Sequence, residues 1–281
     1  MPAYAELAVT SNFSFLRGAS DPEELVAQAR QLGLAGLGIA DRNSVAGVVR
    51  AHTAVRELGA GDHGPFKLAV GARLVFADGT PDILAYPRDR AAWGRLTRLL
   101  SLGKRRAKKG CCILGLPDLL DFIEGLNLIV MPSARLHAGR LGGRFVVVAM
   151  DSATTFPPPL RGRDREGGGG KHRVRDYLPP QPSPTRGEGA HRICRDDSAS
   201  LDLASLLAQL KEAAPRRVWL AASMLYRGDD ARRLAKLAAI AGAAHVPLIA
   251  VNDALYHAAS RRALADVVTC IREHEIGRAH V

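Results

Sequence analysis

Polar side chains follow two of the apolar strands expected near the start of this 281-residue chain. One strand, 5–9, runs into a Ser- and Asn-rich turn, and the other, 34–40, is followed directly by an aspartate and an arginine. In parallel α/β sheets and barrels, the carboxyl ends of the strands face the crevice in which chemistry takes place. The residues predicted to share this rim, two of which offer no useful ligand, are Ala8, Thr10, Ser11, Asp41 and Arg42.

The same two stretches resemble a known family. Residues 6–16 (ELAVTSNFSFL) and 38–44 (GIADRNS) resemble the opening motifs of the polymerase-and-histidinol-phosphatase (PHP) domain. They are similar in particular to the version that begins the C-family bacterial DNA polymerase α subunits of the error-prone branch. The likeness covers roughly 1–150 and 200–274, and it continues through shorter segments: 13–20, 22–26, 46–52, 102–107, 251–257 and 267–272.

The metal-binding motifs of that family are altered in this chain. In active PHP domains a His-x-His motif and an Asp-His motif hold divalent metals that activate water for phosphoester cleavage. Here the positions of the first motif are Ala8 and Thr10, and the second motif reads Asp41-Arg42. Arg73 stands where the family often has an acidic residue, and 252–255 (NDAL) lacks the final histidine of Asn-Asp-x-His.

Asp41 and Asp253 are therefore the remaining candidate metal ligands, and the resemblance marks them as vestigial. A methyl group cannot bind a metal ion, and an always-charged guanidinium repels one. The two carboxylates are expected to form ion pairs with the neighbouring Arg42 and Arg73 instead of holding a metal. No catalytic residue and no bound cofactor are predicted for this chain.

Strands and helices alternate along the chain, which is typical of α/β architecture. Residue 20 or 21 is expected to cap a first helix that Gly33 ends, and Ser44 is expected to cap a second helix through Leu58. This order fits a parallel, barrel-like sheet, and the resemblance implies a distorted (βα)7 barrel of the PHP type. The strands expected are 5–9, 34–40, 68–76, 82–86, 126–131, 145–150, 216–222 and 246–251, and the later helices are 88–102, 116–123, 201–213, 229–242 and 259–273.

Two segments depart from this pattern. Residues 157–197 are rich in Pro, Gly and Arg and have almost no apolar periodicity, so we expect a disordered insertion, similar to a translated bacterial interspersed repeat. Residues 275–281 resemble a translated sequencing adapter and are expected to be a non-native tail of a truncated fragment. The PHP domain is then divided into a first part, 1–156, and a remainder, 198–274.

The formal net charge is +11, and part of this excess lies outside the expected insertion. A basic run closes the helix expected over 88–102, where cations complement the helix dipole. Its members could also contact the phosphate backbone of nucleic acid without sequence preference, and no interleaved aromatic residue suggests base stacking. The candidate nucleic-acid-binding residues are Lys104, Arg105, Arg106, Lys108 and Lys109.

Composition predicts a cytoplasmic protein. No apolar run reaches the length of a membrane span, and the first residues lack the profile of a signal peptide. The four cysteines show no paired metal-binding spacing, which fits a reducing compartment. They are Cys111, Cys112, Cys194 and Cys270.

The resemblance implies a parent protein that is a DNA-directed DNA polymerase for error-prone, damage-tolerant synthesis in DNA replication and repair. Its Mg²⁺-dependent palm domain would lie downstream, so this fragment alone is expected to be inactive and structural. DNA is the expected partner of the parent, and accessory damage-tolerance polymerase proteins are possible further partners.

Two alternatives from other classes remain open. One is a stand-alone metal-dependent PHP phosphoesterase that uses replacement ligands, although none of its candidate histidines stands in a spaced pair. These histidines are His52, His63, His137, His245 and His257. The other is a non-enzymatic module that docks DNA or a protein partner through the basic run.

Overall fold

The computed structural model describes residues 4–59, 66–132 and 202–274. The chain divides into two compact units, 1–145 with 195–281 and 146–194, and the second unit lies outside the described residues. The expected strand at 145–150, the insertion at 157–197, the domain boundaries beside it, Cys194 and the tail at 275–281 also lie outside them.

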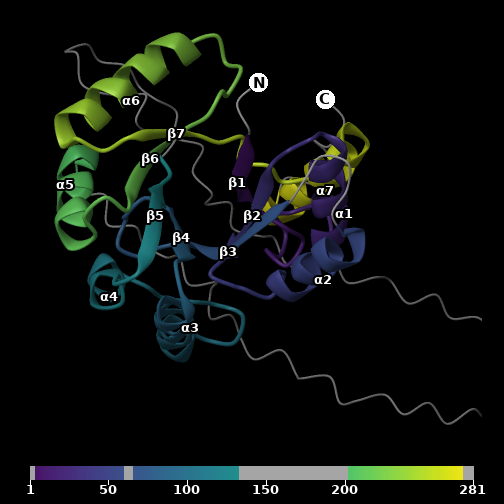
Figure 1. Ribbon diagram of the computed structural model, residues 1–281, viewed down its shortest axis with the longest axis horizontal. Helices are drawn as coiled ribbons and strands as arrows, with labels where there is room; N and C mark the ends of the chain where they lie inside the picture. Colours follow the sequence, from purple (N-terminus) through teal and green to yellow (C-terminus); the bar gives the residue numbers. More distant parts are fainter. Residues whose placement is uncertain (1–3, 60–65, 133–201, 275–281) are drawn as a thin grey trace, which may run out of the picture. The chain divides into compact units, whose positions relative to one another are not determined.

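Seven strands form one sheet in which spatial order follows sequence order (Figure 1). Neighbouring strands pair in parallel from β1 to β3 and from β5 to β7. The parallel pairing expected from the alternation of strands and helices does not extend to β4, which runs antiparallel to both of its neighbours. The strands are β1 (Ala5–Val9), β2 (Gly36–Arg42), β3 (Lys67–Leu74), β4 (Ile83–Pro87), β5 (Leu126–Val130), β6 (Val218–Ala222) and β7 (Leu248–Ala250).

The direction of β4 follows from the short link that precedes it. Eight residues, 75–82, join β3 to β4, and a parallel return would need a crossover of a dozen residues or more. The α/β expectation is nevertheless confirmed, because the sheet is curled and helices connect most of its strands. In the part of the chain that the structure describes, no helix combines the length and apolar character needed to cross a membrane.

The helices lie close to their expected positions. The first begins after Asp21, with Pro22 at its first position, and the Asp21 amide donates to Glu24 Oε2 over 3.0 Å. The helices are α1 (Pro22–Gln31), α2 (Val48–Leu58), α3 (Arg90–Arg105), α4 (Leu116–Asp121), α5 (Leu203–Ala213), α6 (Asp230–Ala244) and α7 (Arg262–Glu273), with a short 3₁₀ turn, η2 (Ala259–Arg261), before α7.

The predicted start of the second helix is wrong. The helix begins at Val48 after Gly47, because the Ser44 hydroxyl accepts the Ala46 amide hydrogen over 3.2 Å and closes a tight turn. Gly47 is also constrained by the rim, since a Cβ there would lie 2.6 Å from Asp41 Oδ2.

Apolar side chains pack in three clusters. The largest buries α3, α4 and α5 against β3 to β6, and the second packs α1 and α2 on β1 and β2. The third contains small residues such as Ala8 and Ala40 together with one large ring, Tyr86. Gly38 and Gly71 make room for this ring, because a Cβ at either position would lie 2.6 Å from a Tyr86 side-chain atom.

The segment after β7 lies alongside β1, so residues from the two ends of the described chain meet. Val9 and Ala254 form an isolated parallel bridge, and the Thr10 amide donates to the Ala254 carbonyl over 3.0 Å. The Ala19 amide donates to the Leu255 carbonyl over 2.8 Å. These contacts complete the rim on which the candidate site stands.

Candidate functional site

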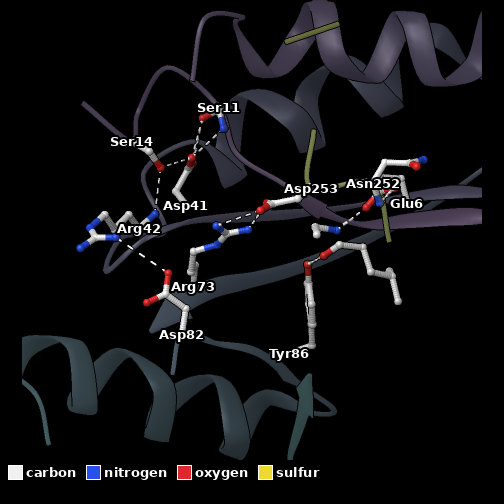
Figure 2. Close-up of polar contacts among 12 residues, drawn as sticks. Glu6, Ser11, Ser14, Asp41, Arg42, Arg73, Asp82, Tyr86, Asn252 and Asp253 are labelled. Carbon is white, nitrogen blue, oxygen red and sulfur yellow. Dashed lines mark hydrogen bonds and ion pairs between the residues drawn. The ribbon is translucent and has the colours of Figure 1, made fainter. Parts of the chain in front are cut away.

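Four sheet-derived segments bring polar side chains to one rim (Figure 2). Ser11 follows β1, Asp41 and Arg42 end β2, Arg73 lies near the end of β3, and Asp253 follows β7. In the parallel register of β2 and β3, Arg42 stands directly opposite Arg73. The shared rim expected from the sequence is therefore present, and β3 and the segment after β7 complete it.

Asp41 is fully buried and is held by two serines of the turn after β1. Its Oδ1 accepts the Ser11 amide over 2.9 Å and the Ser14 hydroxyl over 2.8 Å, and the Ser11 hydroxyl lies within 2.9 Å of both carboxylate oxygens. The Ser14 Oγ in turn accepts the Arg42 amide over 2.8 Å. These hydrogen bonds, together with the backbone constraint at Gly47, fix the carboxylate in the turn.

The expected pairing of Arg42 with Asp41 needs correction. The Arg42 guanidinium forms an ion pair of 3.9 Å with Asp82, just before β4. The Asp41 carboxylate accepts hydrogen bonds from the Ser11 amide and from the hydroxyls of Ser11 and Ser14. Sequence reasoning missed this because the turn that carries the serines folds back onto β2.

The expected ion pair between Arg73 and Asp253 is present. Both terminal nitrogens of the Arg73 guanidinium donate to the Asp253 carboxylate, with Nη1 at 3.5 Å from Oδ2. The Arg73 side chain is only 14% exposed and that of Asp253 is 36% exposed, so the pair is shielded from water mainly on the arginine side. Asp253 adopts a left-handed backbone with φ of 54°, which is uncommon for a non-glycine residue. The pair thus connects β3 to the segment that follows β7.

The residues of the rim do not fit a multinuclear metal centre. Ala8 and Leu255 offer no ligand atom, Asp253 is paired with a guanidinium, and Asp41 is saturated by donors. Over 4–59, 66–132 and 202–274, no group of three or more His, Cys, Asp or Glu side chains is arranged to hold a metal ion. Such a centre needs several converging oxygen or nitrogen ligands.

Glu6 is a rim-supporting residue that sequence reasoning did not single out. It is 4% exposed, and its carboxylate accepts the Ala8 amide at 2.7 Å, the Tyr4 hydroxyl at 2.7 Å and the Asn252 amide at 2.8 Å. These bonds tie β1 to the segment after β7. The available signal was a carboxylate inside an apolar strand, because such a group must find donors when it is buried.

Tyr86 was also missed as a supporting residue. Its hydroxyl donates to the Leu7 carbonyl, so β4 reaches across to β1 inside the curled sheet (Figure 2). Complete burial raises the pKa of Tyr86 far above its ordinary value, and the nearby Glu6 carboxylate adds to that effect. The phenol therefore stays neutral and remains a hydrogen-bond donor.

The candidate replacement ligands are not gathered at the rim as a cluster. His257 Nδ1 lies 2.8 Å from the Ser20 hydroxyl and 3.5 Å from Glu24, a carboxylate that also pairs with Arg261. His52 and His245 are exposed, and His63 and His137 lie outside the described residues. His257 thus has a local role, linking the start of α1 to the segment before α7.

The basic run lies at the carboxyl end of α3, as expected. Lys104 and Arg105 occupy its last turn and are exposed, as are Lys108 and Lys109. Arg106 differs from these because its guanidinium contacts both carboxylate oxygens of Asp118 at 2.8 Å. Binding of nucleic acid by this run stays a prediction.

Comparison with known protein families finds a likeness over the first part of the chain. Residues 6–123 match the PHP domain. The fold likeness of the chain extends to a Bifidobacterium adolescentis structure described as a metal-dependent phosphoesterase, with a TM-score of 0.50, 15% identity, and coverage of 92% of this chain and 89% of the other. At that identity the likeness concerns the fold alone.

Curated relatives show where this PHP domain occurs. An error-prone DNA polymerase of Rhodopseudomonas palustris strain BisA53 is 46% identical over 97% of this chain and 22% of the relative. Error-prone DNA polymerase 1 of Rhizobium meliloti strain 1021 is 45% identical over 96% of this chain and 18% of the relative. The matches fall in the N-terminal part of these proteins, and the chain spans about a fifth of their length.

The contacts of Asp41 predict a structural role that needs no metal. Asp41→Ala removes the acceptor for the buried Ser11 and Ser14 donors, and we expect the free energy of unfolding in EDTA buffer to fall by about 2–3 kcal/mol. Asp41→Asn keeps one acceptor oxygen, so its free energy of unfolding should fall by less than that of Asp41→Ala. The exposed Asp121→Ala serves as the control, and denaturant unfolding is the measurement. Equal stability of Asp41→Ala and wild type would contradict the assignment.

Proposed function

We propose that this chain is the N-terminal PHP region of an error-prone DNA polymerase. The observation that carries the proposal is identity of more than 40% along nearly the whole chain, confined to about a fifth of each relative. The parent would add deoxynucleotides to a primer opposite a DNA template, including damaged template. DNA is then its substrate and partner, and the Mg²⁺ that nucleotidyl transfer uses would bind to the downstream part of the parent.

Within the parent, we assign this region a structural role. A phosphoesterase of this fold would need a ligand set that the described rim does not offer, because its two aspartates are engaged by serines and by Arg73. The same contacts hold β1, β2, β3 and the segment after β7 together. A rigid rim of this kind suits a domain that braces a catalytic body and its accessory proteins in the cytoplasm.

The polymerase assignment is tested by sequencing the gene beyond the codons for this chain. Sequencing the locus through its 3′ side should reveal an open reading frame that continues past codon 281 into the palm and fingers of a polymerase. A native stop codon directly after Val281 would contradict the proposal. The same reads show whether the codons for 157–197 and 275–281 belong to the organism's own gene.

The loss of phosphoesterase activity is tested on the protein itself. With p-nitrophenyl phosphate and added Mn²⁺ or Zn²⁺, we expect hydrolysis no faster than that of the Asp253→Asn variant, because neither protein assembles a metal centre. An active PHP phosphoesterase provides the positive control. Metal-dependent turnover by the wild type that disappears in both Asp41→Asn and Asp253→Asn would restore the alternative of a stand-alone enzyme.

The exposed cations at the end of α3 support a second candidate function, a contact with the DNA backbone. Lys and Arg side chains bind phosphates without sequence preference, and each contact releases counterions. All five members of the run are exposed and lie within six residues of one another. This function is compatible with the structural role, because it requires no chemistry at the rim.

Arg105 and Arg106 provide a matched pair for testing this contact. Both are exposed, but only Arg106 is held by Asp118, so Arg105→Gln should weaken binding of a labelled DNA duplex more than Arg106→Gln does. The slope of log affinity against log salt should fall by about 0.9 for Arg105→Gln if it neutralises one phosphate. Fluorescence anisotropy between 50 and 200 mM salt measures both the affinity for DNA and its dependence on salt. No binding at low salt, or an affinity of Arg105→Gln equal to that of the wild type, would show that the run is only a solvated helix end.

A further inference from the structure

The turn between β1 and α1 presents an aromatic side chain to solvent. Phe15 is 84% exposed, and Phe13 beside it is 38% exposed. Isolated apolar residues on a surface are common, but a phenylalanine ring this exposed on a short loop presents a large apolar face to solvent. Neither ring belongs to any of the three core clusters of the described residues.

This turn is held rigidly. The Ser14 amide donates to the Ser11 carbonyl and the Arg17 amide to the Ser14 carbonyl, each over 2.9 Å. Leu16 adopts a left-handed backbone with φ of 57°, a conformation that is costly for a bulky residue and persists only where its surroundings impose it. A Cβ on Gly18 would lie 2.1 Å from the Ser11 carbonyl oxygen, so the turn closes tightly on itself. Phe15 is thus displayed on a fixed support.

Arginines surround the turn on several sides. Arg50 lies over the Phe13 ring, with its guanidinium carbon 5.5 Å from the ring centre. Arg272 of α7 donates to the Leu16 carbonyl over 3.0 Å, and the Arg42 amide donates to the Ser14 hydroxyl. Arg17 directly follows the carbonyl that Arg272 contacts, and the guanidiniums of Arg42 and Arg272 act on it electrostatically.

The local charge balance leaves Arg17 available to a ligand. Arg50, Arg42 and Arg272 are matched by Glu23 at 3.7 Å, Asp82 at 3.9 Å and Glu273 at 2.8 Å. Among the described residues Arg17 takes part in no ion pair. Partial burial and then the guanidiniums of Arg42 and Arg272 lower the pKa of Arg17 to about 10, against opposing effects of Asp82 and Glu273. Arg17 is still protonated near neutral pH, and an anion would relieve its repulsion.

A flat, exposed aromatic ring next to guanidinium groups is the combination that binds single-stranded nucleic acid. Unpaired bases stack on the ring, while cations hold the adjacent phosphates. A duplex buries its bases in its own stack and offers no such face. We propose that the turn formed by residues 13–17 binds single-stranded DNA, with a base stacked on Phe15 and a phosphate on Arg17. The choice of DNA over RNA rests on the proposed polymerase function.

The experiment uses the whole chain and a fluorescently labelled oligothymidylate at low salt. Loss of one stacked base costs about 1–3 kcal/mol, so Phe15→Ala should weaken binding at least about fivefold in fluorescence anisotropy. Phe15→Leu should weaken it similarly, whereas Phe15→Trp should bind at least as well as the wild type. Leu32→Ala, which removes an exposed apolar side chain at the far end of α1, should leave binding unchanged.

The arginine is tested through salt dependence. Arg17→Gln should reduce the slope of log affinity against log salt by about 0.7, the value for one phosphate of a single strand. Phe15→Ala should lower affinity without changing that slope. Because Phe15 and Arg17 make no contribution to the core clusters, unfolding midpoints close to that of the wild type are expected and confirm that each variant folds.

Several outcomes would overturn the proposal. These are no binding at low salt, affinity of Phe15→Ala within twofold of the wild type, or full binding by Phe15→Leu, which would indicate an ordinary apolar contact with protein. A strong preference for oligouridylate over oligothymidylate would replace DNA with RNA as the ligand. None of these results bears on the reading frame at the 3′ side of the gene, so failure here is distinguishable from failure of the polymerase assignment.

Discussion

The burial of charged groups between β1 and the segment after β7 is the constraint on which the rim depends. Glu6 lies inside the fold as a carboxylate, and its three recorded donors come from Tyr4, Ala8 and Asn252. A buried carboxylate without donors would cost several kcal/mol, so the fold must bring Asn252 to β1. The hydrogen bond between Glu6 and Asn252 joins residues near the two ends of the described chain. It also positions Asp253, the residue that follows Asn252.

Asp253 then meets Arg73, and the same logic extends to β3. A shielded ion pair adds little net stability compared with a well-packed apolar pair, because both charges must leave water. Its effect is on geometry, since removing Asp253 would leave the largely buried Arg73 guanidinium unpaired. The guanidinium of Arg73 on β3 and the carboxylate of Asp253 after β7 therefore link these two segments.

Much of the fold follows from local patterns in the sequence. The ends of α1 are marked by Asp21, Pro22 and Gly33, and apolar runs mark most of the strands. The direction of β4 did not follow, because an apolar run has no direction and only the length of the link at 75–82 restricts it. The start of α2 was also missed, because a serine can close a local turn as readily as it can cap a helix.

The site was predictable where it depends on strand order and unpredictable where it depends on tertiary contacts. Strand ends placed Ser11 and Asp41 together, and charge alone suggested that Arg73 would pair with a carboxylate. Sequence could not show that Asp41 is held by hydroxyls, or that Glu6 and Tyr86 support the rim from inside, since these contacts join residues 27 to 246 positions apart. The exposure of Phe15 was equally hidden, because the motif that contains it reads as an ordinary apolar stretch.

The inner and outer faces of the β1–α1 turn therefore carry separate constraints. Inward, Ser11 and Ser14 saturate Asp41 and remove it as a ligand. Outward, the same turn projects Phe15, and Arg17 is subject to the charges of the Arg42 and Arg272 guanidiniums. The backbone bonds that fix the turn join Ser11, Ser14 and Arg17, so they do not depend on a metal ion at the inner face. The turn is therefore rigid by its own hydrogen bonds, and its outer surface carries the exposed ring of Phe15.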